Sequence, residues 1–425
     1  MRIFILILVS GLVLSACFLT MGESGDDAEV AITIGGGGRA AVSAWPPTEA
    51  NGMLASLEHQ ITFRGRGETI TRTLGKGSLS GRFQVPAGRY DVTVEALSDG
   101  LLFGTGAASL DAKAGASNAL SVAMQQTDTV FLLASTAADW TDAVNAIKNG
   151  GNNKKYVITL TGNFDVAGNT STTPTFGQVG NINVLIRGNH TMSMSLNPGQ
   201  LLSIGPNQAV VLQDIDLNLK PKDVASFTNT TSAVHIKEGA LNMQGSASVY
   251  GNNYSGNGGG VYVEGGTFTM KDNSSVHDNQ GSSGGGVYVN GGTFIMQDNA
   301  SVHDNNTGSN GGGVYVEGDS TATPTLNAIF IMKGRAEVYG NFSNGSGGGV
   351  FVGSVSSFRL AGGTVYGDTG NKKNEATNGA SLYVGPGGTA TYGGVDGATN
   401  SFFSNPPNGK IENTITHMGI QGTHW

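Results

Sequence analysis

Residues 258–279 read GGGVYVEGGTFTMKDNSSVHDN, and residues 284–305 read GGGVYVNGGTFIMQDNASVHDN. A third copy of this repeat opens at Gly311, a fourth at Gly347, and looser copies lie at residues 233–236 and 381–384. The central residues of successive Val-x-Val triplets are 27, 26, 27, 36 and 32 positions apart. A recurring unit of this length is the signature of a repeat architecture.

Each copy contains three short runs that favour strands: Val-Tyr-Val, Thr-Phe-x-Met and Ser-Val-His. Gly, Asp and Asn residues separate the runs, as turn formers do. Three strands with three corners fit one coil of a right-handed parallel β-helix, whereas a propeller blade needs about 40 or more residues. The nonapeptide calcium-binding β-roll has a different period and a different Asp position. The repeat therefore predicts a single-stranded parallel β-helix.

Strand alternation assigns the two faces of each strand. The valines of Val-x-Val and the Phe and Met of the second run are predicted to point inward and to stack from coil to coil. The Asn that follows the third run predicts an amide ladder at one corner, like the ladders of stacked sheets. The ladder positions are Asn252, Asn279, Asn305 and Asn341, with Asp368 in the last place.

Outward positions of the first run form an aromatic column that begins after His235. Its members are Tyr262, Tyr288, Tyr315, Phe351 and Tyr383. Sugars and apolar partners stack on aromatic faces, so this column is the candidate ligand-binding surface. The alternative is that the rings only stack on one another and stabilise the coil. A second, weaker column is made of Tyr250, His277, His303, Tyr339 and Tyr366.

The N-terminus has the form of a secretory signal, a basic residue followed by an apolar run over residues 1–16. It ends in Leu14-Ser-Ala-Cys17, which is similar to the lipobox of bacterial lipoproteins. The resemblance implies that Cys17 becomes the lipidated first residue and that acyl chains hold the protein on a membrane. In the retention rule known for some bacterial lipoproteins, Phe rather than Asp at residue 18 implies the outer membrane or cell surface. Residues 17–27 are then a lipidated tether.

Residues 28–125 alternate like the strands of a small β-sandwich, with predicted strands at 30–34, 59–63, 69–73, 81–85, 90–95 and 119–124. The stretch Val85-Pro-Ala-Gly-Arg-Tyr90 resembles a corner found in prealbumin-like and carboxypeptidase-regulatory-like sandwiches. This resemblance implies a fold and no activity. We expect a spacer or presentation module, with a binding module as the alternative.

The β-helix is expected over residues 127–395, with regular repeats over about 233–384. Thr136-Ala-Ala-Asp139 is a capping signal, and Trp140, Ala143, Val144 and Ile147 follow at helical spacing. One amphipathic helix here would cover the open end of the first coil, so Trp140 is predicted to be part of a cap rather than a ligand platform. Residues 396–425 are an end cap or tail.

The regular part of the chain also resembles a known family. Asn, a polar loop and Gly-Gly-Gly-Val recur from Asn252, Asn279, Asn305 and Asn341. This is similar to the paired repeats of the polymorphic outer-membrane proteins, which are β-helical adhesins, and to β-helix lipoproteins of bacterial surfaces. Val-His or Val-Tyr replaces the leading Phe of that family, and no translocating barrel follows. The resemblance implies an interaction or adhesion role.

An enzyme of the pectate lyase or glycosidase type is the alternative, because such enzymes share the β-helix and must be judged by their site. Asp272 and Asp298 lie one coil apart and are the weak candidates for a shared hard cation. They occupy equivalent repeat positions, whereas an active site is a singular constellation. No singular catalytic constellation is present, and we predict neither a metal nor a cofactor.

Composition limits the class of protein and its partners. Glycine accounts for 68 of 425 residues, charged residues make up 13%, and the net charge of −8 disfavours nucleic acid as a partner. The sequence thus predicts a lipid-anchored surface interaction protein that binds a polysaccharide or a surface protein. A polysaccharide lyase or hydrolase and a purely structural surface protein are the alternatives.

Overall fold

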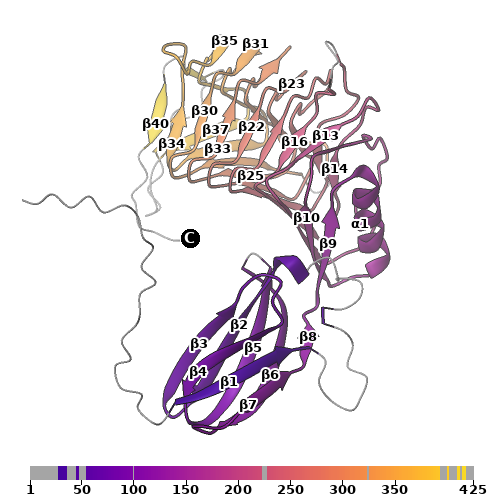
Figure 1. The fold of residues 1–425 in the computed structure, drawn as a ribbon. Coiled ribbons are helices and arrows are strands. Elements are labelled where there is room, and N and C mark those ends of the chain that lie inside the picture. Colours follow the sequence, from indigo (N-terminus) through magenta and orange to yellow (C-terminus); the bar gives the residue numbers. More distant parts are fainter. Residues whose placement is uncertain are drawn as a thin grey trace, which may run out of the picture. The chain divides into compact units, whose positions relative to one another are not determined.

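The structure is a computed structural model that describes residues 27–35, 45–46, 54–98, 100–222, 227–322, 325–392, 400–401, 409–411 and 414–417. Cys17, the predicted signal segment and most of the predicted tether lie outside these residues. The chain divides into two compact units, Met1–Thr127 and Asp128–Trp425 (Figure 1). The prediction of an all-β protein with a small sandwich and a right-handed parallel solenoid is confirmed. No helix in the described part of the chain has the length and apolar character that a membrane crossing requires.

The N-terminal unit is built from two small sheets. One has the order β4-β1-β7, with β1 Asp27–Ile34, β4 Ser80–Pro86 and β7 Asn118–Val122. The other has the order β3-β2-β5-β6-β8, with β2 Leu57–Gly65, β3 Glu68–Leu74, β5 Gly88–Ser98, β6 Leu101–Ala112 and β8 Met124–Gln126. Leu57, Ile61 and Phe63 alternate with more exposed residues along β2 and are fully buried. This alternation packs one face of the sheet into a core.

Strand β6 was not predicted from the sequence. Its Gly104 and Gly106 weaken a strand pattern, but the structure shows why they are there. A Cβ on Gly104 would lie 2.2 Å from the Trp45 ring, and one on Gly106 would lie 2.6 Å from the Ala123 carbonyl oxygen. The predicted strand at 119–124 is two strands, because β7 pairs with β1 and β8 pairs with β6.

The Pro-Ala-Gly-Arg-Tyr corner has a direct physical role. The Tyr90 hydroxyl donates a hydrogen bond of 2.8 Å to the carbonyl oxygen of Pro86. Gly88 lies between them with φ of +159°, within the region that favours glycine. The motif therefore fixes the turn between β4 and β5.

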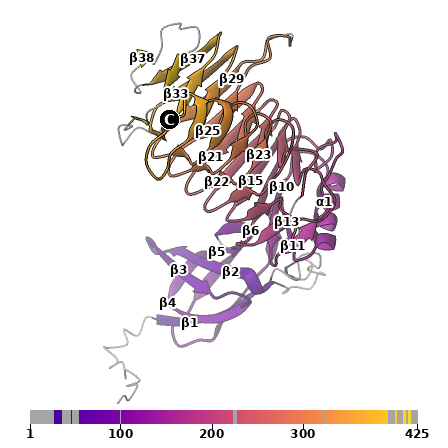
Figure 2. The same ribbon diagram turned by 90° about the horizontal axis from the view of Figure 1, so that it is seen from above.

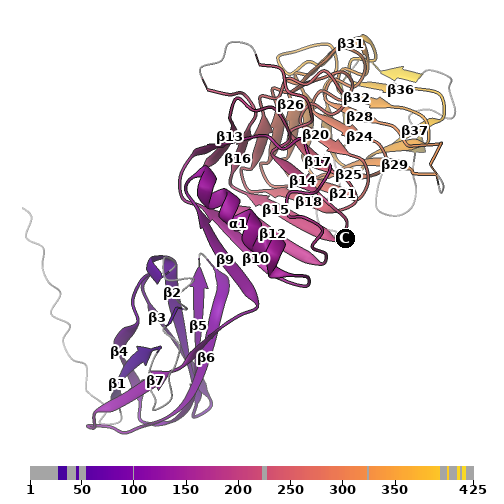
Figure 3. The same ribbon diagram turned by 90° about the vertical axis from the view of Figure 1, so that its right-hand side faces the viewer.

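The C-terminal unit is a parallel solenoid of about nine turns. We name its sheets in the order in which each repeat supplies them. The first sheet holds the Val-x-Val strands: β14 Leu202–Ile204, β17 Val234–Ile236, β20 Val261–Val263, β24 Val287–Val289, β28 Val314–Val316, β32 Val350–Val352, β36 Leu382–Val384 and β39 Gly409–Ile411. Figure 3 shows β17, β20, β24, β28, β32 and β36 in succession.

The second sheet holds the Thr-Phe-x-Met strands, and Figure 2 shows their succession along the solenoid. They are β9 Thr129–Ala134, β10 Lys155–Leu160, β12 Ile182–Arg187, β15 Gln208–Gln213, β18 Ala240–Gln244, β21 Thr267–Met270, β25 Gly292–Met296, β29 Ala328–Met332, β33 Ser356–Leu360, β37 Gly388–Tyr392 and β38 Asn400–Ser401.

The third sheet holds the Ser-Val-His strands. They are β11 Phe164–Val166, β13 Thr191–Met194, β16 Asp216–Asn218, β19 Ser248–Tyr250, β22 Ser275–His277, β26 Ser301–His303, β30 Glu337–Tyr339, β34 Gly363–Val365 and β40 Ile415–His417. A fourth sheet, absent from the prediction, follows the Asn corner. Its strands are β23 Gln280–Gly281, β27 Asn306–Thr307, β31 Phe342–Ser346 and β35 Glu375–Asn378.

The predicted inward residues form the solenoid core. Phe268, Phe294, Phe330 and Phe358 are fully buried, and their neighbouring ring centroids lie 4.8–5.0 Å apart. The Val-x-Val valines of the regular copies are also fully buried. In the early coils the predicted run at 210–217 is two strands, β15 and β16, because Asp214 turns the chain with φ of +53°.

Both ends of the solenoid are covered. Helix α1, Ala137–Gly150, begins at the predicted Thr136 and Asp139 capping box and buries Trp140 and Ile147 in the core. Strand β9 precedes the helix and already pairs with β10, so the first strand comes earlier than predicted. At the other end β38, β39 and β40 pair antiparallel with β37, β36 and β34. An antiparallel strand on each of three parallel sheets ends the coil stacking.

Candidate functional site

The structure places Asn252, Asn279, Asn305 and Asn341 in one buried column, each about 1% exposed. Each side-chain oxygen of the later three accepts a hydrogen bond of 3.0–3.1 Å from the backbone N–H of the Asn one coil earlier. Each side-chain amide of the same three also donates to carbonyl oxygens of its own coil and of the previous one. These residues hold the corner of the coil and are not available to a ligand.

The last member of the ladder is Asn374, and the prediction of Asp368 for this place is wrong. Asp368 is exposed. The oxygen of Asn374 accepts from the Asn341 backbone at 2.9 Å. The last coil has extra residues before this corner, so the ladder position shifts by six places along the chain.

Asp272 and Asp298 have a structural role at another corner. Both adopt left-handed backbone angles, with φ of 56° and 58°, as Asp does at turns. The Asp272 carboxylate accepts from the backbone N–H of Gly245 at 2.9 Å, and the Asp298 carboxylate approaches the backbone N of Asp272 at 3.4 Å. Within the described ranges, no group of three or more His, Cys, Asp or Glu is placed to hold a metal ion.

The aromatic column of the first sheet runs along its outer face in continuous register from His235 to Tyr383. Neighbouring ring centroids lie 4.7–5.4 Å apart, and the planes of Tyr288, Tyr315 and Phe351 are parallel within 8°. Each inner ring therefore covers the faces of its neighbours. Stacking of a sugar on the ring faces, as predicted from the sequence, is blocked there, and the column presents ring edges and hydroxyl groups.

Burial within the column is uneven. Tyr288 is 7% exposed and Tyr315 is 9% exposed, whereas Tyr262, Phe351 and Tyr383 are half-buried. Burial raises the pKa of Tyr288 and of Tyr315 well above the usual value for tyrosine, because desolvation disfavours the phenolate. Both hydroxyls therefore stay protonated at any physiological pH and are able to donate hydrogen bonds.

A carboxylate or amide group lies two residues after the ring in three successive coils, at Glu264, Asn290 and Glu317. His235 pairs with Glu264 through Nε2 at 2.8 Å. The Asn290 amide donates to the Tyr262 hydroxyl at 3.2 Å, and the Tyr315 hydroxyl donates to Glu317 at 2.7 Å. These flanking residues were not predicted from the sequence, although a polar residue directly after three successive Val-Tyr-Val triplets is a repeated signal.

The second column, on the third sheet, is equally regular. Tyr250, His277, His303 and Tyr339 stack with centroids 4.8–4.9 Å apart and planes within 6°. Each histidine pairs with the Asp that follows it, His277 with Asp278 at 2.7 Å and His303 with Asp304 at 2.8 Å. Desolvation lowers the pKa of His303 below its usual value.

The second column ends differently from the first. Tyr366 meets Tyr339 edge-on. The Lys372 ammonium lies 4.6 Å from the centroid of Tyr339 and binds Glu337 at 2.5 Å. This end of the column is therefore already occupied by groups of the chain itself.

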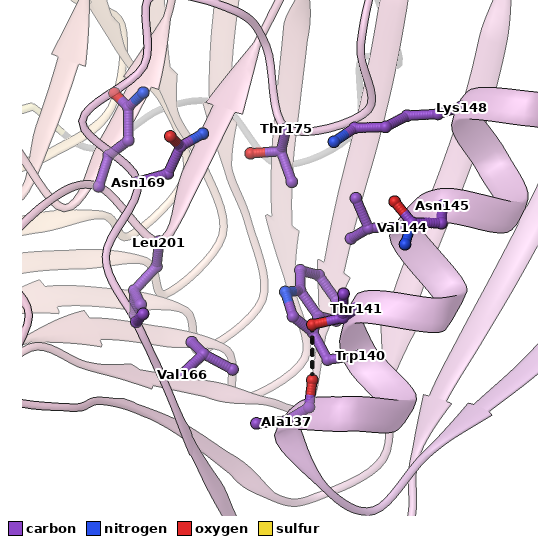
Figure 4. A pocket seen from close by; sticks show the side chains of 12 residues that line it. Ala137, Trp140, Thr141, Val144, Asn145, Lys148, Val166, Asn169, Thr175 and Leu201 are labelled. Carbon is purple, nitrogen blue, oxygen red and sulfur yellow. Dashed lines mark hydrogen bonds between the residues drawn. The ribbon is translucent and has the colours of Figure 1, made fainter.

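A groove of about 320 Å³ lies between helix α1 and the first coils. Figure 4 shows Trp140, Val144, Asn145 and Lys148 on the helix side, facing Val166, Asn169, Thr175 and Leu201. Trp140 is 7% exposed and is part of the continuous solenoid core. The structure thus gives Trp140 the role of a cap residue, with its remaining surface in the groove wall.

Comparisons with known proteins find no matching family model, no similar curated protein and no similar solved structure. The resemblance to polymorphic outer-membrane proteins therefore rests on the repeat motif.

Proposed function

We propose that this protein is a cell-surface interaction protein, lipid-anchored through Cys17, that binds carbohydrate along the first sheet of its solenoid. The observation that carries the proposal is the row of tyrosine hydroxyls, carboxylates and an amide on the outer face of that sheet. Tyr262, Tyr288 and Tyr315 lie in register on successive strands, with Glu264, Asn290 and Glu317 beside them.

Such a row suits a ligand that itself repeats. Equivalent residues of neighbouring coils are separated by about 4.8 Å, so a chain of similar units meets similar groups at each step. Binding pockets combine apolar and aromatic surface with a few placed polar groups, and the ring edges and hydroxyls of the first sheet supply both. Hydroxyl-rich polymers match this chemistry because each hydroxyl both donates and accepts.

The solenoid supports presentation at a surface. About nine turns of continuous core give a rigid rod with a long side. Lipid anchoring is proposed from the Leu-Ser-Ala-Cys17 motif and tested separately: a Cys17→Ser variant should lose incorporation of an alkyne-tagged fatty acid and move from the membrane to the soluble fraction. Unchanged labelling and fractionation of that variant would remove the anchor from the proposal.

Binding is tested with the full chain, purified in mild detergent, on a glycan array. The double variant Glu264→Gln with Glu317→Gln should lose signal, because neutral amides accept hydrogen bonds from sugar hydroxyls less strongly than carboxylates do. The matched control is Asp278→Asn with Asp304→Asn, which changes two carboxylates beside the second column and should bind as the wild type does. Shortened or unsaturated glycan products would instead show an enzyme, and absence of binding would leave a structural surface protein.

A further inference from the structure

The hydroxyl of Tyr288 is the exception in the aromatic column. Its two neighbours are paired, Tyr262 by the Asn290 amide and Tyr315 by Glu317. Tyr288 contacts the rings on either side, but its hydroxyl has no hydrogen-bond partner among the residues that the structure describes. The Tyr288 side chain is 93% buried within the ring stack. Its hydroxyl is thus a donor in the middle of the site that no described residue uses.

The pairing pattern explains why the donor is left over. Asn290 follows β24, the strand that carries Tyr288, and its amide donates to the Tyr262 hydroxyl one coil earlier. Glu317, one coil ahead, accepts from its own neighbour Tyr315. The Tyr288 hydroxyl is therefore hydrogen-bonded to neither Asn290 nor Glu317. Its oxygen is not among the sealed, unpaired atoms of the described residues, so it still reaches solvent.

We propose that the Tyr288 hydroxyl is a specificity-determining donor that binds a neutral, hydroxyl-rich polysaccharide and that the flanking carboxylates exclude anionic ones. This rests on the proposed function and names its ligand class. One sugar hydroxyl accepts from Tyr288 and donates to Glu317, which keeps one carboxylate oxygen unpaired among the described residues. That arrangement satisfies both protein groups at once.

Charge complementarity selects against acidic sugars. Glu317 and Glu264 lie directly beside the column, and the charges of Glu264 and Asp319 both act on Tyr262. His235 pairs with Glu264 but does not supply a positive charge at neutral pH, because burial lowers its pKa. The Lys237 ammonium contacts the Thr172 carbonyl oxygen. A uronate or sulfate group placed at Tyr288 would face the Glu317 carboxylate, and like charges at short range repel strongly.

The test measures dissociation constants of the full chain for neutral oligosaccharides, namely hexamers of glucose, mannose, galactose and N-acetylglucosamine, and for matched hexamers that carry uronate or sulfate groups. The key variant is Tyr288→Phe, which removes the hydroxyl and keeps the ring stack. It should weaken neutral binding roughly three- to tenfold, the worth of one hydrogen bond. The control Tyr339→Phe, in the second column, should bind as the wild type does.

A second variant gives an independent measure. Glu317→Gln removes the charge but keeps an acceptor for Tyr315, so it should bind anionic hexamers more tightly than the wild type does. Wild-type preference for the anionic set, or wild-type affinity in Tyr288→Phe, would overturn this inference and leave carbohydrate binding standing. No binding of either set by the wild type would overturn the proposed function as well.

Discussion

The side-chain oxygen of Asn305 lies 3.0 Å from the backbone nitrogen of Asn279 and accepts its hydrogen bond. The same Asn305 donates to the carbonyl oxygens of Val276 and His303 at 3.0 and 2.9 Å. One buried side chain thus satisfies backbone groups of two coils at a corner where the sheets are interrupted. Repetition of this arrangement from coil to coil makes the ladder a continuous polar element beside an apolar core.

Removing one Asn of the ladder should destabilise the folded solenoid. Asn305→Ala leaves the buried Asn279 N–H without its acceptor and takes one donor away from each of two carbonyl oxygens, which should lower the free energy of unfolding by roughly 2–4 kcal/mol. Urea unfolding followed by circular dichroism measures the effect. Asn299→Ala is the matched control, because Asn299 is exposed at another corner of the same coil, and it should change stability by less than about 0.5 kcal/mol. Equal effects of the two substitutions would contradict a structural ladder.

The repeats were predictable because identical side chains at a fixed period stack on one another, which fixes strand alternation and the core. The fourth sheet was not predictable, because Gln280–Gly281 and Asn306–Thr307 differ between copies, are only two residues long and contain a single strand-forming residue, Thr307. Their pairing is imposed by the ladder beside them. The aromatic column was predictable as a row, but the coverage of its ring faces and the unpaired Tyr288 hydroxyl were not. Those depend on which coil each flanking Glu or Asn reaches.

The close approach at Gly104 predicts a strong effect of a single methyl group. In Gly104→Ala the added Cβ would lie 2.2 Å from the Trp45 ring and 2.8 Å from a backbone oxygen. We expect the sandwich to lose about 1–3 kcal/mol, as overpacked cores do, measured as a lower thermal midpoint of that unit. Gly75→Ala is the control, since nothing lies within 4 Å of the new Cβ. A midpoint unchanged by Gly104→Ala would show that Trp45 does not pack on β6.

The burial of His59 predicts that the sandwich loses stability as the pH falls. Its ring is fully buried and its Nε2 accepts from the Trp45 indole at 3.1 Å. Burial lowers the pKa of His59 below its usual value of 6.5. The unfolded chain therefore binds a proton at a higher pH than the folded one, so stability is complete above about pH 7 and falls as the pH drops through 6.5 toward the folded pKa.

The measurement is urea unfolding at pH 7.5 and at pH 5, followed by Trp45 fluorescence with Trp140 and Trp425 replaced by Phe. His59→Gln keeps an acceptor for the indole and has no proton to gain, so its loss of stability between the two pH values should be smaller than that of the parent. His190→Gln, in the solenoid, should leave the pH dependence of the Trp45 signal as it was. A pH dependence that is the same in His59→Gln and its parent would assign the acid sensitivity elsewhere.

We predict that the antiparallel strands at the end of the solenoid prevent copies of the chain from associating there. Strands β38, β39 and β40 pair with the last parallel strands of three sheets, and the side chains of Ile411 and Ile415 pack against the core. Truncation after Tyr392 would expose the backbone groups of β34, β36 and β37 as a template for another chain. We expect concentration-dependent association of the truncated protein in light scattering, while the full chain in the same buffer keeps its mass.

Lys410→Glu, which alters β39 without removing it, should stay monomeric. A truncated chain that remains monomeric at high concentration would mean that the last coil is protected by its own side chains rather than by these strands.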